Sequence, residues 1–512
     1  MTPSDFLERH GLAENPFRGE EARCDDVFAR MGGADSNADP HGVHHADFEK
    51  IAGDLRRPSS SVVFGEKGAG KTAIRLQLER RIAGFNKANP DRKVLLIPHD
   101  DLNALLDRVH ERTPGKSVLE SLQQVRLVDH VDAVLHAVTP RVIDAVLDRR
   151  LSPEIDLGDD PRKTLRKAEA SVRHDLLLLQ AVYDRAEQAP LRTRMLRRTL
   201  RVGASRGRLM AGVLAVVAPL GIAGGASLFY TYAPDDWRTP TAILALAGVI
   251  AVYLLYLLWL LWGEGFLLRR PGKKLRRQVR VIARAEASYA ASLRLLPRAS
   301  RDASILPMTD SDEARYAMLD RLWRVLAAFG YAGGVLVVDR VDEPTLVSGD
   351  PDKMRAVIWP MMNNKFLQQP RLGVKMLLPV ELRHALFRES SAFFQEARLD
   401  KQNMIERLEW TGPMLYDLCE ARLAACAKPG TAGPQLMELF EPDVSRQDVI
   451  DALDRMHQPR DAFKLLYRLL GDHCAQVTAG EERWRIPRHT LQNVVKQETE
   501  RLSQLYRGVR PA

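Results

Sequence analysis

The sequence predicts an α/β protein: a parallel sheet of the P-loop NTPase type, a helical insertion carrying a two-helix transmembrane hairpin, and an α-helical C-terminal lid. Three observations predict this fold class. The apolar run 61–64 precedes Gly-Glu-Lys-Gly-Ala-Gly-Lys-Thr at 65–72, the order of a strand, a phosphate-binding loop and a helix. Residues 333–339 repeat the buried-strand pattern and end in an aspartate. Between these segments, 209–232 and 239–263 contain no charged residue.

The loop at 65–72 has the residue types that phosphate binding requires. Glycines allow backbone N–H groups to turn toward an anion without a Cβ in the way. The residues after Thr72 favour a helix, whose positive dipole end would face the same point. We therefore expect Lys71 to contact the β- and γ-phosphates and the Thr72 hydroxyl to bind Mg²⁺. The predicted nucleotide-binding residues of the loop are Gly65, Glu66, Lys67, Gly68, Ala69, Gly70, Lys71 and Thr72.

The apolar run before Asp339 predicts the second strand of the site. A P-loop protein needs an acid at the end of such a strand to help hold Mg²⁺, and Asp339 is the predicted metal-side carboxylate. A strand-end aspartate that caps the next turn is the alternative. Asp342 or Glu343 is expected to activate the attacking water, because this step needs a carboxylate near the γ-phosphate. Lys71, Asp342 and Glu343 are therefore the predicted catalytic residues.

Three further segments predict strands of the same sheet. They cover residues 93–98, 372–379 and 404–410. Glu381 follows the second of these segments, at the strand end where open α/β sheets place their ligands. It is a candidate sensor of the γ-phosphate, with an ordinary helix-start role as the favoured alternative.

The two uncharged runs predict a transmembrane helical hairpin. At about 1.5 Å per residue, each run is long enough for the roughly 30 Å hydrocarbon core of a bilayer. Residues 233–238 between them predict a short turn. Arg-rich flanks on both outer ends favour the cytoplasmic side. The expected location is the inner (cytoplasmic) membrane, with two transmembrane helices and both termini cytoplasmic; a hairpin buried in a soluble core is the alternative.

The formal net charge of +9 is explained by the flanks of the predicted hairpin. Such a basic cluster is attracted to anionic lipid head groups, so the charge balance requires no nucleic-acid partner. The four cysteines lack CxxC spacing and indicate reduced thiols, not a zinc site or a disulfide framework. The flanking basic residues are Arg192, Arg194, Arg197, Arg198, Arg201, Arg206, Arg208, Arg269, Arg270, Lys273, Lys274, Arg276, Arg277 and Arg280.

The separation of the two predicted halves of the site defines the domain organisation. Some 260 residues lie between them, far more than a βαβ connection requires, so the excess is interpreted as an insertion. The predicted segments are 1–58, an N-terminal segment with the helix before the loop; 59–100, the first part of the P-loop ATPase domain; 101–208, a helical stalk; 209–263, the hairpin; 264–310, a returning helical stalk; 311–410, the second part of the ATPase domain; and 411–512, a helical lid, with a winged-helix-like end as one interpretation.

The order of these motifs resembles the KAP family of P-loop ATPases, which are relatives of the STAND and AAA+ ATPases. The resemblance rests on the loop at 65–72, the inserted hairpin, and a strand that ends in Asp339-x-x-Asp342. It implies ATP and Mg²⁺ as ligands, hydrolysis of ATP to ADP and phosphate, and homo-oligomers. Residues 457–461 are similar to the Pro-Arg segment that opens a lid helix in AAA+ proteins, which makes Arg460 a candidate γ-phosphate contact. The family usually has a second acid where this chain has Arg340, a departure that favours slow hydrolysis.

The N-terminus is similar to the opening of ExeA-type secretion ATPases over residues 6–17. In AAA+ proteins the segment before the P-loop often packs on the adenine ring. The resemblance implies this role for Pro16, Phe17 or a residue of the segment 44–57. Plain core packing is the alternative for Phe17.

The expected function is a membrane-anchored, ATP-binding P-loop ATPase that acts as a regulatory or signalling switch through ATP binding and slow hydrolysis. Its expected partners are ATP, a bilayer with anionic head groups and further copies of the chain. Two alternatives stay open: a motor that assembles an envelope or secretion complex, and a nucleic-acid-loading AAA+-like ATPase. A short external turn supplies no extracytoplasmic domain for the motor. The basic charge away from the hairpin is too dilute for a convincing phosphate footprint.

Overall fold

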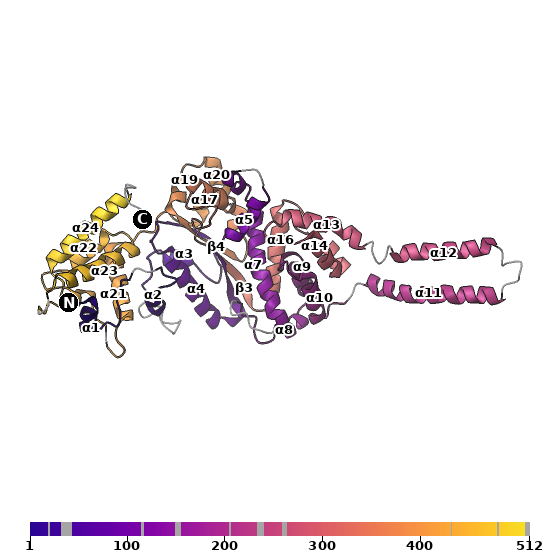
Figure 1. Ribbon diagram of the computed structural model, residues 1–512, viewed down its shortest axis with the longest axis horizontal. Helices are drawn as coiled ribbons and strands as arrows, with labels where there is room; N and C mark the ends of the chain where they lie inside the picture. The colour runs from indigo at the N-terminus through magenta and orange to yellow at the C-terminus, as the bar shows by residue number, and fades with distance from the viewer. Residues whose placement is uncertain are drawn as a thin grey trace. The chain divides into compact units, whose positions relative to one another are not determined.

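The computed structural model divides the chain into two compact units. Unit 1 consists of Met1–Asp101 and Gly333–Ala512, and unit 2 consists of Leu102–Ala332 (Figure 1). The chain therefore leaves unit 1 once and returns to it, so that segments far apart in the sequence build one body. The structure describes residues 1–18, 21–31, 43–113, 117–148, 155–203, 206–232, 240–258, 264–431, 433–478 and 481–506.

Unit 1 is built on a five-stranded sheet with the strand order β2-β3-β4-β1-β5. The pairs β3–β4, β4–β1 and β1–β5 are parallel, so the carboxyl ends of these strands open at one edge. The parallel α/β sheet predicted from the sequence is confirmed. The strands are β1 (Ser61–Gly65), β2 (Lys93–His99), β3 (Tyr331–Val338), β4 (Leu372–Pro379) and β5 (Asn403–Ile405).

The last strand is shorter than the predicted run 404–410. It ends at Ile405 because the following residues leave the sheet to pack on the loop after β1. The amide of Leu408 donates to the Phe64 carbonyl at 2.8 Å, and the Trp410 indole Nε1 donates to the Ala69 carbonyl at 2.9 Å. The second half of the predicted strand therefore packs against β1 and the loop after it, a difference that the local sequence pattern does not reveal.

Helices cover both faces of the sheet, as an α/β core requires. On one face, α3 (Phe48–Ala52) and α4 (Lys71–Ala88) pack on inward side chains of the strands, such as Val63, Val335 and Leu377. The other face carries α17 (Pro351–Ile358) and α19 (Val380–Leu386), near α18 (Asn364–Leu367) and α20 (Ser391–Ala397) (Figure 1). Because α4 starts where the loop after β1 ends, the helix N-terminus lies at the carboxyl edge of the sheet.

The C-terminal helices share one hydrophobic core with the N-terminal helices α1 (Pro3–Arg9) and α2 (Asp26–Met31). Phe6 and Phe17 are fully buried in this core. The Arg422 guanidinium connects the C-terminal helices to the N-terminal segment, because it donates to the Pro16 carbonyl at 2.5 Å and to Asp25 at 2.6 Å. The C-terminal helices are α21 (Gly412–Ala425), α22 (Arg446–Asp454), α23 (Pro459–Gln476) and α24 (Arg488–Tyr506).

Unit 2 is helical and contains a buried ionic cluster. Asp132 of α7 accepts hydrogen bonds from the Tyr183 hydroxyl of α9 at 2.7 Å and from Arg315 of α16 at 3.2 Å. Burial raises the pKa of Asp132 to about 6, although Arg315 and Tyr183 oppose this. The helices are α5 (Asn103–Glu111), α6 (Val118–Leu122), α7 (Leu127–Asp148), α8 (Pro161–Lys167), α9 (Ala170–Tyr183), α10 (Ala189–Thr199), α11 (Arg206–Tyr232), α12 (Pro240–Leu258), α13 (Glu264–Gln278), α14 (Glu286–Leu295), α15 (Arg298–Asp302) and α16 (Asp312–Ala327).

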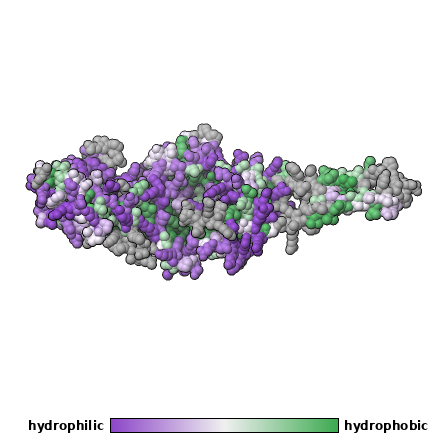
Figure 2. Space-filling view, turned by 60° about the horizontal axis from the view of Figure 1, so that its bottom comes forward, coloured by the Kyte–Doolittle hydropathy of each residue, from purple (hydrophilic) through white to green (hydrophobic). Residues whose placement is uncertain are grey.

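The predicted transmembrane hairpin is wrong. Its two runs form α11 and α12, and apolar side chains gather at their surface (Figure 2). Across the described ranges, however, none of the helices combines the length and the apolarity that crossing a bilayer requires. Counting uncharged residues takes no account of their composition: α11 contains Pro219 and several glycines. The predicted turn at 233–238 and residues 239 and 259–263 lie outside the described residues. The expected membrane location, with two spanning helices and both termini cytoplasmic, is corrected accordingly.

Replacing Lys375 by methionine is expected to stabilise unit 1. Lys375 lies in the middle of β4, fully buried, and among the described residues its Nζ has no hydrogen-bond partner. Burial lowers its pKa to about 7, with help from nearby Arg81. In the unfolded chain Lys375 has its ordinary pKa of 10.5. Below pH 7 the buried lysine is charged, and the free energy of unfolding is lowered by the full cost of burying that charge. This cost disappears as the pH rises from 7 toward 10.5.

The expected gain of Lys375→Met is on the order of 3 kcal/mol at pH 6 and close to zero near pH 10. Urea unfolding of the full chain at both pH values measures it. Lys87→Met, at an exposed lysine near the end of α4, is the control and should change little. A destabilised Lys375→Met variant, or an equal gain at both pH values, contradicts this prediction.

Candidate functional site

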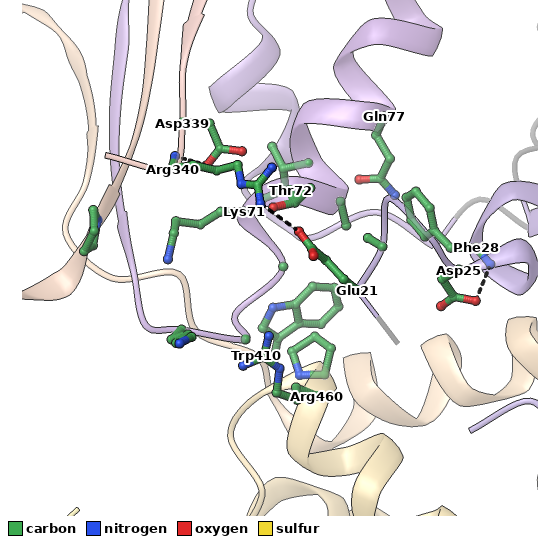
Figure 3. Close-up of a pocket in the computed structure, with 18 of the residues that line it drawn as sticks. Glu21, Asp25, Phe28, Lys71, Thr72, Gln77, Asp339, Arg340, Trp410 and Arg460 are labelled. Carbon is green, nitrogen blue, oxygen red and sulfur yellow. Dashed lines mark hydrogen bonds and ion pairs between the residues drawn. The ribbon is translucent and has the colours of Figure 1, made fainter. Parts of the chain in front are cut away.

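A cavity of about 460 Å³ opens at the carboxyl edge of the sheet in unit 1. The loop after β1, the ends of β3 and β4, the segment around α2 and the start of α23 supply its walls (Figure 3). Of the predicted site residues, Lys67, Gly68, Gly70, Lys71, Thr72, Asp339, Asp342, Glu343 and Arg460 line it, as does Glu381, the candidate γ-phosphate sensor. The other three, Gly65, Glu66 and Ala69, belong to the same loop without lining the cavity. Residues from positions 67 to 460 are thus brought to one place.

Two glycines give the loop its shape. Gly68 and Gly70 have φ values of 103° and 90°, a region that side chains with a Cβ rarely adopt. A Cβ on Gly68 would also lie 2.9 Å from the Gln458 Oε1 atom. The loop therefore curls tightly before α4, whose first amides have no acceptor inside the helix. Such amides at a helix N-terminus are a ready anion site.

Lys71 lies among carboxylates at the bottom of the cavity. In the structure its ammonium donates to the Gly65 and Glu66 carbonyls at 2.7 and 2.9 Å. Burial lowers the pKa of Lys71, and attraction from Asp342, Asp339 and, less strongly, Glu381 opposes this. Lys71 and Asp339 consequently face the same cavity and are not on unconnected parts of the protein.

Asp339 has a carboxylate oxygen available for a ligand. Its side chain is 1% exposed, and Oδ1 accepts the Arg340 amide at 2.9 Å. Oδ2 is buried and has no hydrogen-bond partner among the described residues. Burial raises the pKa of Asp339 to about 6, only partly offset by the hydrogen bond from the Arg340 amide and by Arg75 and Lys71. Asp339 and Thr72 line the same cavity, so an orphaned buried carboxylate oxygen and a threonine hydroxyl are both available there for a divalent cation (Figure 3).

A metal held here would have few protein ligands. Within the described residues, no group of three or more His, Cys, Asp or Glu side chains is arranged to hold a metal ion. Mg²⁺ commonly takes one or two protein oxygens and completes its octahedron with water and phosphate oxygens. Thr72 and Asp339 match this requirement, whereas Zn²⁺ and Ca²⁺ need more protein ligands.

Asp342 and Glu343 follow Asp339 in a turn at the cavity mouth. Both line the cavity, but their surroundings differ. Asp342 is near enough to Lys71 to be its strongest electrostatic partner. Glu343 is half exposed and pairs with the Arg340 guanidinium at 2.6 Å. Asp342 therefore interacts electrostatically with the lysine of the phosphate-binding loop, whereas Glu343 is paired with Arg340.

The start of α23 contacts the loop directly. Arg460 lies in the first turn of α23, and its Cβ would be 3.1 Å from a Cβ on Gly68. Gln458, the residue before the helix, donates to the Glu66 carboxylate, which also accepts from Arg407 at 2.7 Å. Glu66 therefore joins the loop to the C-terminal helices and to the segment after β5. This contact links any movement of the loop to α23.

Several apolar residues also line the cavity and were not predicted from the sequence. The side-chain amide of Gln77, another lining residue, donates to the Val43 carbonyl at 3.2 Å. Of the residues expected to pack on a base, Phe17 and Pro16 do not line the cavity, because Phe17 is buried in the core of the terminal helices. The lining residues that were not predicted include Phe28, Val43, Ile74, Gln77, Leu418 and Phe463. No local pattern marks them, since they come from α2, α4, α21, α23 and the segment before α3.

Together the fold and the cavity define a parallel α/β protein with a glycine-rich turn into a helix and a buried carboxylate on a nearby strand. Comparison with known proteins adds no relative: no family model, no curated protein and no solved structure matches the chain. Because the inserted hairpin is wrong, the resemblance to KAP ATPases rests only on the loop at 65–72 and the strand that ends in Asp339-x-x-Asp342, and function has to be argued from the cavity itself.

Proposed function

We propose that this protein binds ATP with Mg²⁺ in the unit 1 cavity and hydrolyses it slowly, as a regulatory switch. The observation that carries the proposal is the meeting of Lys71, Thr72 and the unpartnered Oδ2 of Asp339 in one cavity. A cation, a hydroxyl and a free carboxylate oxygen at a helix N-terminus are the groups that a metal-bound triphosphate needs. No such combination is required for the stability of a sheet edge.

Each residue has a role that follows from its place. The amides of the loop and the Lys71 ammonium would hold the phosphates, and Thr72 with Asp339 would hold Mg²⁺, which when bound neutralises charge on the phosphate oxygens. Lys71 would exchange its two carbonyl acceptors for phosphate oxygens, a stronger charge-assisted interaction. Arg460, beside Gly68, would contact the γ-phosphate from α23.

Hydrolysis needs a carboxylate that orients water. The water oxygen forms a bond to the γ-phosphorus, the bond from that phosphorus to the β–γ bridging oxygen breaks, and ADP keeps the electron pair. Asp342 or Glu343 accepts the proton of the attacking water, which then passes to phosphate. Glu343 is paired with Arg340 in the structure, so hydrolysis requires either that this ion pair break or that Asp342 orient the water. We therefore expect slow turnover.

The switch is supported by the contact between the loop and α23. Glu66 of the loop binds Gln458 directly before α23, so a ligand on the loop changes the environment of the C-terminal helices. Binding energy that differs between two arrangements of α23 would shift their populations. Self-association on nucleotide binding is part of the proposal through the KAP resemblance alone.

Asp342→Asn and Glu343→Gln test the hydrolytic part. We expect wild type to bind ATP with Mg²⁺ and to release phosphate slowly. One of the two variants should lose about 100-fold or more in turnover with little change in ATP affinity, because a water-orienting acid acts on the reacting water and not on the bound phosphates. Phosphate release and calorimetric ATP titration measure the two quantities. Asp352→Asn, at an exposed acid on α17, is the matched control. Wild type that binds no ATP contradicts the proposed function.

A further inference from the structure

We infer that Arg340 is the cation that stabilises the γ-phosphate during hydrolysis and that Glu343 and Glu21 hold it until a triphosphate binds. This inference rests on the proposed function. It assigns a role to the residue by which this chain departs from the usual KAP pattern. It also connects two acids, one beside the catalytic turn and one in the N-terminal segment, to the same event.

The backbone places the Arg340 side chain over the cavity. Arg340 follows Asp339 directly and has a φ of 59°, in the left-handed region that non-glycine residues seldom adopt. Its amide donates to the Oδ1 atom of Asp339, which fixes the turn. Figure 3 shows the guanidinium over the cavity and facing Glu21. An arginine next to the metal-side carboxylate is thereby directed back toward the phosphate-binding loop.

The present partners of Arg340 are weak enough to be exchanged. Its guanidinium contacts Glu343 at 2.6 Å and Glu21 at 3.6 Å, and about half of each acid's side chain is exposed. Such solvent-exposed pairs contribute little to stability. The Arg340 Nε, by contrast, is buried and has no hydrogen-bond partner among the residues that the structure describes. The side chain is thus only partly satisfied where it lies.

A triphosphate offers Arg340 a better partner. A phosphate group carries more charge than a carboxylate and matches the planar fork of a guanidinium with two parallel hydrogen bonds. The transfer of Arg340 to the γ-phosphate places a positive charge where negative charge develops in the transition state. The same transfer releases Glu343, which then becomes free to orient the attacking water. One movement of Arg340 would therefore supply the cation for the γ-phosphate and release the acid that orients water.

Arg340→Asn is the decisive variant because asparagine tolerates the left-handed backbone while removing the charge. We expect turnover to fall about 100-fold or more. The affinity for ATP relative to ADP, both measured with Mg²⁺ by calorimetry, should fall at least about tenfold, since only ATP has a γ-phosphate. Arg340→Lys should keep part of both. Glu21→Gln should raise ATP affinity a few-fold by releasing the arginine.

Arg371→Asn is the matched control. Arg371 also has a positive φ, of 66°, but is exposed and does not line the cavity, so turnover and the ATP/ADP affinity ratio should stay at wild-type values. Unchanged turnover and an unchanged ratio in Arg340→Asn overturn the inference while leaving the proposed function intact. Wild type that binds neither nucleotide overturns the proposed function itself. Thermal unfolding of each variant shows whether a lost activity comes from the missing cation or from an unfolded protein. If Arg340→Asn does not fold, the turnover and the ATP/ADP affinity ratio of Arg340→Lys test the inference instead.

Discussion

Asp339→Asn is expected to make unit 1 more stable at pH 7.5 and, at the same time, to abolish Mg²⁺-dependent nucleotide binding. The stability effect follows from burial. The pKa of Asp339 is raised to about 6 from an ordinary 3.8, so the folded state penalises the charged carboxylate. This penalty is complete above about pH 6 and disappears as the pH falls toward 4, because the folded protein then binds the proton more tightly than the unfolded chain.

The expected gain for Asp339→Asn is about 2 kcal/mol at pH 7.5, or a few degrees in melting temperature, and about a third of that at pH 4.5. The Asn side-chain oxygen can still accept the Arg340 amide, so the turn is retained. Thermal unfolding at the two pH values measures the gain. Asp91→Asn, at an exposed acid before β2, should show no such difference.

The functional effect of Asp339→Asn has the opposite sign. Wild type should melt at a higher temperature with ATP and Mg²⁺ than with ATP and a chelator, since a ligand of the folded state stabilises it by mass action. The variant should lose this Mg²⁺-dependent increment. In wild type the increment should weaken below about pH 6, where the carboxyl is protonated and no longer a ligand. A destabilised variant at pH 7.5, or one that keeps the increment, would show that Oδ2 is not kept free for a metal.

Lys71→Ala should have the largest effect on nucleotide binding. Removing one charge-assisted contact to phosphate in a partly buried site is expected to lower ATP affinity or turnover about 100- to 1,000-fold. Phosphate release and calorimetry with ATP give the two numbers. Lys87→Ala removes the same charge from the far end of the same helix, so it separates a local effect from one on net charge or on α4. ATP affinity equal to wild type in Lys71→Ala would place the triphosphate elsewhere.

Local patterns were sufficient for the elements that build the sheet edge. The strand β4 has the predicted bounds, 372–379, and β1 ends where the glycine-rich loop begins. These predictions succeed because alternation, apolar runs and glycine spacing are properties of a few consecutive residues. The position of Asp339 directly after β3 follows in the same way.

The hairpin shows where such local counting fails. Absence of charge alone predicts a membrane span here, yet helix length and apolarity are separate requirements. In α11, proline and glycines interrupt an uncharged run, so the absence of Lys, Arg, Asp and Glu did not mean sufficient apolarity. An uncharged run therefore predicts a helix more safely than it predicts the surroundings of that helix.

The sequence by itself determined the strand-loop-helix unit around Lys71, the strand that ends at Asp339, and the chemical types available for a phosphate and a metal. Only the tertiary structure decided that Arg340 pairs with Glu21, that the Trp410 indole donates to the Ala69 carbonyl of the loop, and that Phe28 and Phe463 line the cavity. The physical reason is distance along the chain. Backbone geometry acts between neighbours, whereas these contacts join residues up to several hundred positions apart, and packing of the whole unit selects them.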